Sequence, residues 1–234
     1  MLEDVLRGGF SELGLEPDGR AAERYRIYYE NLEETNKVMN LTAISGEADV
    51  ARLHFLDCAA LLGMQDFAGS RVIDVGTGAG FPGLALKIAC PEMQLTLLDS
   101  LDKRIGFLRD TCAKLGFDDV ECVHARAEEI PDGYRQSFDF AVSRAVARLT
   151  LLCELCLPYV KRGGAFIAMK GPELDAELKE AANAIRLLGG SVEKRTDYRI
   201  PGTDIVHSAV IIRKVSDTPA KYPRRWAQIK KAAL

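Results

Sequence analysis

The chain has 234 residues, of which 47% are hydrophobic and 28% are charged, and its formal net charge is −3. That length and apolar content are enough for one domain with a sizeable core plus an extension. No uninterrupted apolar stretch is long enough to cross a membrane, and the first residues do not resemble a secretion signal. We therefore expect a cytoplasmic protein with no membrane partner.

The apolar spacing changes along the chain. Residues 20–39 and 48–64 have the spacing of helices, with a break between them. From residue 71 onward, short apolar strands alternate with helices. The strands are expected at 71–75, 94–98, 120–124, 138–143 and 164–169. The helices are expected at 82–90, 102–115, 148–158 and 173–188. Two last strands at 191–200 and 205–214, joined by a short turn, are expected to form a hairpin.

This alternation predicts an α/β fold with a Rossmann-like, mostly parallel sheet and helices on both faces. The hairpin would add an antiparallel strand near the C-terminal end of the chain. We expect a helical N-terminal extension at 1–65, a ligand-binding α/β domain at 66–215 and a basic tail at 216–234.

The charge is unevenly distributed. Residues 213–234 carry seven cations and one acid, so the rest of the chain is net acidic. A basic tail on an acidic body fits contact with a polyanion, although a solvated tail that adds solubility would have the same composition. Charge alone leaves both interpretations open.

Cysteine and histidine usage argues against a metal site. Six cysteines lie mostly within apolar stretches, and one pair, Cys153 and Cys156, has CxxC spacing. A zinc site of this type needs a second pair, and the sequence has none. The three histidines are scattered without metal-ligand spacing. We therefore expect buried, reduced thiols and no metal ion.

The most informative stretch runs from Asp74 to Gly83. An apolar run at 71–73 leads into an acid, and glycines follow at positions 76, 78, 80 and 83. Pro82 and the apolar spacing of 84–89 then indicate a helix. A strand that re-enters as a helix through such a turn exposes bare main chain to a ligand, and a tight turn alone would not need four glycines.

Two nucleoside ligands compete for this turn. The segment Gly78–Gly83 satisfies GxGxxG, and Asp99 lies about 20 residues further on, which is typical of a nicotinamide dinucleotide site. However, Asp74 would oppose a pyrophosphate at the helix N-terminus and suits a positive amino or sulfonium group instead. The D-x-G-x-G-x-G register and the terminal hairpin also favour S-adenosylmethionine. The contacts expected from this register are Asp74, Gly76, Gly78 and Gly80.

Several further motifs accompany the glycine turn in a fixed order. They are Asn36–Thr42, Asp74–Gly83, Leu97–Arg104, Ser143-Arg144-Ala145, Lys170-Gly171 and Tyr222–Arg225. From about residue 25 to the C-terminus, this set resembles the RsmG (GidB) family of bacterial 16S rRNA methyltransferases. The resemblance implies a class I methyltransferase fold and N7 methylation of one guanine in the 530 loop of 16S rRNA. It also implies cofactor contacts at Gly76, Phe81, Ala127, Glu128 and Arg144.

The positions of these residues agree with such roles. Asp99 closes the second strand, where it can accept hydrogen bonds from ribose hydroxyls or, alternatively, cap the next helix. Ala127 and Glu128 follow the third strand, where a backbone N–H and a carboxylate can read the adenine edge. Arg144 ends the fourth strand and Lys170 follows the fifth, at the edge where ligands bind open α/β sheets.

The chemistry limits what the protein must supply. Guanine N7 is a lone pair without a proton, so we expect no general base and assign Arg144 a positioning role. We expect RNA contacts at Lys170, Arg224 and Arg225, with 16S rRNA, the 30S subunit or an assembly intermediate as partner. Trp226 beside them could stack on a base or pack the tail onto the body. The alternative function is methyl transfer to a small molecule, in which the basic tail would have no part.

Overall fold

The computed structural model describes residues 1–144, 147–171 and 173–234. Within these ranges, seven strands form one sheet in the order β3-β2-β1-β4-β5-β7-β6. The strands are β1 (Arg71–Val75), β2 (Gln94–Asp99), β3 (Glu121–His124), β4 (Phe138–Arg144), β5 (Val160–Lys170), β6 (Gly190–Arg199) and β7 (Val206–Lys214). The first five are parallel, whereas β7 is antiparallel to both of its neighbours. The predicted mostly parallel sheet with a terminal hairpin is confirmed.

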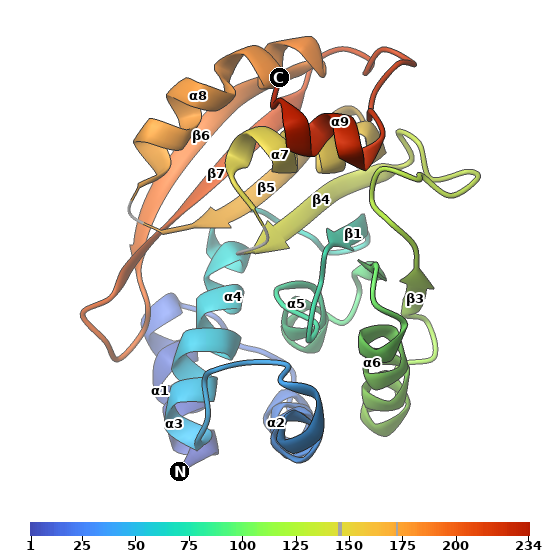
Figure 1. The fold of residues 1–234 in the computed structure, drawn as a ribbon. Coiled ribbons are helices and arrows are strands. Elements are labelled where there is room, and N and C mark those ends of the chain that lie inside the picture. The colour runs from blue at the N-terminus through green and yellow to red at the C-terminus, as the bar shows by residue number, and fades with distance from the viewer. Residues whose placement is uncertain (145–146, 172) are drawn as a thin grey trace.

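Helices cover both faces of this sheet (Figure 1). One face carries α1 (Leu2–Leu13), α2 (Ala21–Met39), α3 (Glu47–Val50), α4 (Asp57–Ala59), α5 (Gly83–Ala89) and α6 (Asp102–Leu115). The other face carries α7 (Leu149–Cys156), α8 (Leu174–Leu187) and α9 (Trp226–Lys231). Neighbouring strand residues take opposite faces: Val72 packs in the first layer and Ile73 in the second. This period of two is what a sheet buried on both sides requires.

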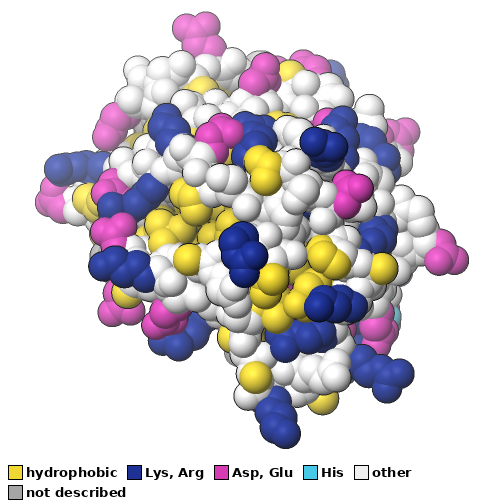
Figure 2. Space-filling view, turned by 90° about the horizontal axis from the view of Figure 1, so that it is seen from above, with side chains coloured by type: hydrophobic (Ala, Val, Ile, Leu, Met, Phe, Trp, Pro, Cys, Tyr) yellow, Lys and Arg dark blue, Asp and Glu magenta, His cyan; other side chains and the backbone are white. Residues whose placement is uncertain are grey.

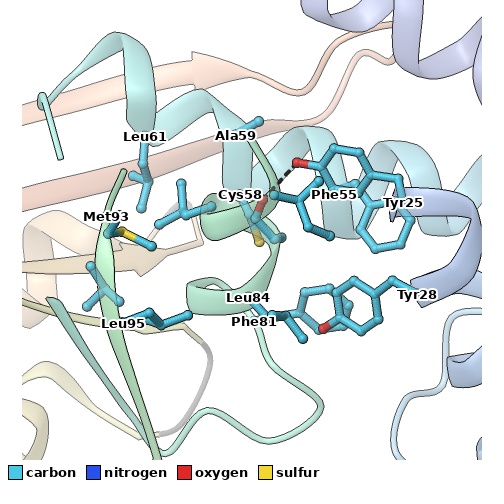
Figure 3. Packing of buried hydrophobic residues seen from close by; sticks show 14 of the residues in the cluster. Tyr25, Tyr28, Phe55, Cys58, Ala59, Leu61, Phe81, Leu84, Met93 and Leu95 are labelled. Atoms are coloured by element: carbon cyan, nitrogen blue, oxygen red, sulfur yellow. Dashed lines mark hydrogen bonds between the residues drawn. The ribbon is translucent and has the colours of Figure 1, made fainter. Parts of the chain in front are cut away.

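The N-terminal helices are part of the main core. Tyr25 and Tyr28 are fully buried, and their hydroxyls donate to the main-chain oxygens of Ala85 (2.7 Å) and Ala79 (2.5 Å). Both rings pack against Phe55, and Tyr28 also stacks on Phe81 (Figure 3). A buried phenol needs such an acceptor, so α2 is tied to the glycine turn and to α5.

Some elements differ from the sequence-based expectations. Helix α1 was not assigned separately, although it lies in the N-terminal extension that we expected to be helical. The helix expected at 48–64 is a succession of α3, a π-helical stretch Ala51–Leu56, α4 and a 3₁₀ turn Ala60–Gly63. Strand β5 begins at Val160, four residues earlier than expected. The sequence did not indicate this start because Lys161, Arg162 and Gly163 are exposed and lack an apolar pattern. Apolar spacing in the sequence predicts a helix but does not distinguish α-, π- and 3₁₀-helical hydrogen bonding, which depends on tertiary contacts.

The C-terminal segment packs against the body of the protein. Tyr222 and Ile229 are buried in the same cluster as α7 and α8. Arg135 donates to the carbonyl oxygens of Thr218 (2.9 Å) and Tyr222 (2.8 Å). The face that carries α8 and α9 shows basic and acidic side chains together around small apolar patches (Figure 2). In the parts of the chain that the structure describes, no helix has the length and apolar character to cross a membrane.

Candidate active site

A cavity of about 450 Å³ opens at the carboxyl edge of β1, β2 and β4. Its wall combines the glycine turn, the loops after β2 and β3, the end of β4 and parts of the N- and C-terminal segments. The lining residues are Leu41, Thr42, His54, Val75–Ala79, Phe81, Leu98–Ser100, Arg104, Ala125–Glu128, Arg144, Leu152, Leu155 and Trp226. Most of the predicted cofactor contacts therefore meet in one place, as expected where the strand order reverses in an open α/β sheet.

The glycine turn approaches its surroundings too closely for side chains at two positions. Gly80 has a φ of 104°, and a Cβ there would lie 2.5 Å from the hydroxyl of Tyr28. At Gly83, a Cβ would lie 2.8 Å from the Cβ of Asp74. By contrast, a Cβ at Gly78 would meet nothing within 4 Å, so this part of the turn faces open space in the cavity. Two glycines serve packing and one leaves room for a ligand.

Asp74 lies inside the turn and does not line the cavity. Its Oδ2 accepts hydrogen bonds from the Thr77 hydroxyl (2.7 Å) and the Gly83 N–H (2.8 Å), and the residue is fully buried. Oδ1 is buried and has no partner among the described residues. Burial raises the pKa of this carboxyl to about 7. We expected a direct contact between Asp74 and the ligand from the sequence. The structure instead places the carboxylate where buried N–H and O–H groups of the turn need an acceptor.

Asp99 fixes the turn from the neighbouring strand. One carboxylate oxygen accepts from the Gly78 N–H (3.0 Å) and lies 3.4 Å from the Arg104 guanidinium. The other accepts from the N–H of Leu101 at the start of α6 (2.9 Å). The side chain lines the cavity while it also organises the first turn of the next helix. In this geometry Asp99 can both contact ribose hydroxyls in the cavity and cap the next helix, the two roles considered from the sequence.

Ala127 and Glu128 lie in the loop after β3 and line the same cavity. The Ala127 carbonyl accepts from the Tyr159 hydroxyl (2.9 Å), which anchors this loop to the core. The Glu128 carboxylate lies 3.9 Å from the Arg126 guanidinium. The loop therefore presents an acid that is already positioned beside the glycine turn.

Arg144 is held at the end of β4 by groups from the N-terminal helices. Its Nη1 donates to the Leu53 carbonyl (3.0 Å) and to Asp57 Oδ2 (3.1 Å), and its Nη2 donates to His54 Nδ1 (2.7 Å). The guanidinium also lies 4.8 Å from the centre of the Phe81 ring. Of the motif Ser143-Arg144-Ala145, Ala145 lies outside the described residues. The rest places a cation at the rim of the cavity in one fixed orientation.

His54 is neutral in this network. Burial, followed by the charge of Arg144, lowers its pKa to about 3. Because Nδ1 accepts from Arg144, the proton resides on Nε2, which donates to the Thr42 hydroxyl (2.8 Å). The ring also stacks on Phe81, with centroids 4.3 Å apart. His54 thus acts as an acceptor that orients the arginine.

Asp57 is the residue that sequence reasoning missed. It is almost fully buried in the N-terminal helical segment, and besides Arg144 it accepts hydrogen bonds from the Tyr198 hydroxyl (2.8 Å) and His207 Nδ1 (2.9 Å). The hydrogen bond to Asp57 raises the pKa of His207. An acid in an apolar helical stretch was the only available signal, and it does not identify partners about 90 and 150 residues away.

The three residues expected to bind RNA have different environments. Lys170 is mostly buried, paired with Glu177 (2.8 Å). Arg224 makes two hydrogen bonds, of 2.9 and 2.7 Å, to the buried carboxylate of Glu154. Arg225 is exposed at the start of α9. The described part of the chain has no group of three His, Cys, Asp or Glu side chains placed to hold a metal ion.

Proteins of similar sequence cover nearly the whole chain. A family model described as GidB, rRNA small subunit methyltransferase G, matches residues 21–201. A ribosomal RNA small subunit methyltransferase G of Alkaliphilus metalliredigens is 46% identical over 224 residues, which is 94% of each chain. The enzyme of that name in Clostridium perfringens is 41% identical and covers 99% of this chain and 98% of its own.

Solved structures give the fold. TrmN from Thermus thermophilus has a TM-score of 0.57 at 20% identity, covering 77% of this chain and 53% of that one. A SAM-dependent methyltransferase from Aquifex aeolicus has a TM-score of 0.51 at 19% identity, covering 68% and 89%. The sheet is that of class I S-adenosylmethionine-dependent methyltransferases. From the family match and the near full-length identity, the chain belongs to the GidB family of rRNA small subunit methyltransferases G.

Proposed function

We propose that this protein methylates N7 of a single guanine in the 530 loop of 16S rRNA. One observation carries the choice of atom: the titratable groups around Arg144 are engaged in holding it. His54 Nδ1 accepts from the arginine, and Asp57 accepts from three donors. These groups are therefore occupied as orienting partners. Guanine N7 carries a lone pair and no proton. A methyl acceptor of this kind needs no general base to deprotonate it.

The residues of the first cavity fit S-adenosylmethionine. Asp99 and Glu128 line the cavity, and its arginines 104, 126 and 144 are each paired with an acid. A wall with paired charges of both signs suits a zwitterionic ligand. A pyrophosphate would need unpaired cations or free N–H groups instead. Asp99 suits the ribose hydroxyls, Ala127 and Glu128 suit the adenine edge, and the turn at Gly78 admits the remainder against bare main chain.

The protein contributes mainly position. When bound, S-adenosylmethionine supplies a methyl group whose bonding electrons return to sulfur as the N7 lone pair forms the new bond. Arg144 has one orientation beside this cavity, and its planar fork can hold a guanine oxygen or a phosphate so that N7 lies in line with the methyl group. No proton moves in the transfer itself.

RNA contact involves the basic groups near the cavities. Trp226 is 37% exposed and lines the first cavity, next to the exposed Arg225. An aromatic ring beside an exposed arginine suits base stacking and phosphate contact. Lys170 is part of the same proposal at the second cavity described below. Arg224 contributes chiefly by holding this segment in place, because its guanidinium is paired with Glu154.

The proposed partner is 16S rRNA, alone, in the 30S subunit or in an assembly intermediate, and the proposed site of action is the cytoplasm. The test offers the purified protein these three substrates, prepared without the modification, together with S-adenosylmethionine. Nucleoside mass spectrometry of the digested RNA should find one 7-methylguanosine, which maps to the 530 loop. If the RNA gains no 7-methylguanosine, or gains it at another site, the proposal is wrong.

A further inference from the structure

A second cavity of about 690 Å³ lies beside the first and shares its residues His54 and Arg144. It is lined by Ile44, Leu53, His54, Asp57, Arg144, Met169, Lys170, Gly171, Glu173, Glu177, Ile205 and His207. Its volume is in the range of small-molecule sites. The residues come from the N-terminal helical segment, the ends of β4 and β5 and the start of β7, so the cavity extends from the cofactor site toward the hairpin.

The shared wall is held by a network of hydrogen bonds. Arg144 is fixed by Leu53, His54 and Asp57, and Asp57 is fixed by Tyr198 of the hairpin. A group held in the second cavity can therefore contact the same guanidinium that borders the first. This is the geometry that transfer from one bound molecule to another requires, because the two sites must stay in register.

The lining has the composition of a purine site. Ile44, Met169 and Ile205 supply apolar surface, while Glu173 and Glu177 supply carboxylates. Oε2 of Glu177 accepts from Lys170 (2.8 Å) and from the N–H of Leu149 (2.7 Å), which fixes that acid between the end of β5 and the start of α7.

We propose that the second cavity receives the target guanine after it leaves its stack, and that Glu173 and Glu177 read its Watson–Crick edge. Guanine presents two adjacent donors there, N1–H and N2–H, which a carboxylate accepts together. Adenine presents a donor beside an acceptor and would place a lone pair against the acid. The same carboxylates favour the cationic product. Extrusion gives an enzyme access to a base that is otherwise hidden.

This inference rests on the proposed function and is tested separately from it. A Cβ at Gly171 would meet nothing within 4 Å, so Gly171→Phe adds an aromatic ring at the lining of the cavity without a backbone clash. Gly8→Phe is the control, because Gly8 is equally open and lies in α1, away from both cavities. We expect Gly171→Phe to bind S-adenosylmethionine within about threefold of wild type and to lose rRNA methylation by about 100-fold or more.

Transfer by Gly171→Phe within threefold of wild type would overturn the inference. A wild-type protein that methylates no rRNA would instead overturn the proposed function, so the two failures are distinct. Gly171→Phe must also have the same melting temperature as the Gly8→Phe control, which shows that the variant is folded. S-adenosylmethionine binding by calorimetry shows directly that the first cavity is intact.

Base reading has its own test. An rRNA substrate with inosine at the methylated position keeps N7 but lacks the N2 amino group. Wild-type protein should methylate it about 10-fold more slowly than the guanosine substrate, the loss expected for one bidentate contact. The double variant Glu173→Gln, Glu177→Gln should discriminate less between the two RNAs. Equal rates on both RNAs with wild-type protein would refute this part of the inference.

Discussion

The guanidinium of Arg144 has partners from distant parts of the chain. Leu53 and Asp57 belong to the N-terminal helical segment, and Phe81 belongs to the glycine turn. Tyr198 of the hairpin then holds Asp57. Each hydrogen bond fixes one direction of a planar fork, so the arginine has a single orientation between the two cavities. The orientation of Arg144 therefore depends on residues from the N-terminal helical segment, the glycine turn and the hairpin.

Replacing Asp57 tests this dependence. In Asp57→Asn, Arg144 loses its charged partner, and we expect methyl transfer to fall by about 10- to 100-fold, since small displacements at a reacting centre have effects of this size. The pKa of His207 should fall, because its hydrogen bond to Asp57 is what raises it. Steady-state kinetics and NMR titration of His207 measure the two effects.

The control for Asp57→Asn is Asp197→Asn, which changes an exposed acid of the same hairpin. It should leave both the kinetics and the His207 titration near wild type. An unchanged rate in Asp57→Asn at a temperature where the variant is folded would contradict the positioning role.

The buried carboxyl of Asp74 makes stability depend on pH. Its folded pKa, about 7, is above the unfolded value, so the folded state binds a proton more tightly than the unfolded chain does between about pH 4 and pH 7. Stability from this group is therefore lost as pH rises through that window. In Asp74→Asn the loss should disappear. Denaturant unfolding at pH 5 and pH 8 should show a smaller decrease for the variant, and identical decreases would contradict the assignment.

The turn between β1 and α5 shows what an element can require of a single residue. Gly83 is the first residue of α5, and its N–H donates to Asp74 Oδ2. The close contact brings the helix start against the carboxylate, which leaves no space for a side chain. The shape of the cofactor cavity thus depends on how closely α5 approaches β1.

Gly83→Ala should disturb this approach. The added Cβ would lie 2.8 Å from Asp74 Cβ and 2.9 Å from Leu97 Cδ2, so the helix start must shift. We expect a loss of about 1–3 kcal/mol in the free energy of unfolding and weaker S-adenosylmethionine binding. Gly106→Ala, in the open on α6, should be neutral or slightly stabilising. Chemical denaturation and calorimetry compare them; equal stability of the two variants would contradict the packing argument.

On the scale of the whole molecule, the C-terminal segment closes the second helical layer. Ile229 of α9 packs with α7 and α8, and the Arg224–Glu154 pair joins this segment to α7. Glu154 is almost completely buried, so its charge depends on that arginine. The basic composition that suggested a polyanion partner therefore includes at least one cation with a structural task.

Two neighbouring arginines separate the structural and RNA roles. Arg224→Ala removes the cationic partner of the buried Glu154 carboxylate, which keeps the main-chain N–H of residue 224, and should lower the free energy of unfolding by about 3 kcal/mol. Arg225→Ala should change stability by less than about 0.5 kcal/mol. It should weaken RNA binding and reduce the slope of log binding constant against log salt concentration by about one, the change expected for one lost phosphate contact. Unfolding curves and filter binding at several salt concentrations measure these effects, and a stable Arg224→Ala protein would contradict the assignment.

The sequence by itself determined the order of strands and helices, the methyl donor expected at the glycine turn and the family. These properties are local or ordered along the chain: apolar periodicity sets the elements, and the spacing from Asp74 to Gly83 sets the turn. The first residues of β5 were missed because Lys161, Arg162 and Gly163 are exposed and carry no apolar pattern. Helix α1 was not assigned, although its buried residues Leu2, Leu6 and Phe10 follow a helical spacing.

Only the tertiary structure decided which polar side chains meet. Asp57, Tyr198 and His207 lie far apart in sequence, and their convergence on Arg144 follows from packing of the N-terminal helices beside the hairpin. Folding likewise buried Asp74 beneath its own turn. Residue type and spacing report what a side chain can do, whereas burial and partners, which are properties of the folded chain, decide which of those capacities is used.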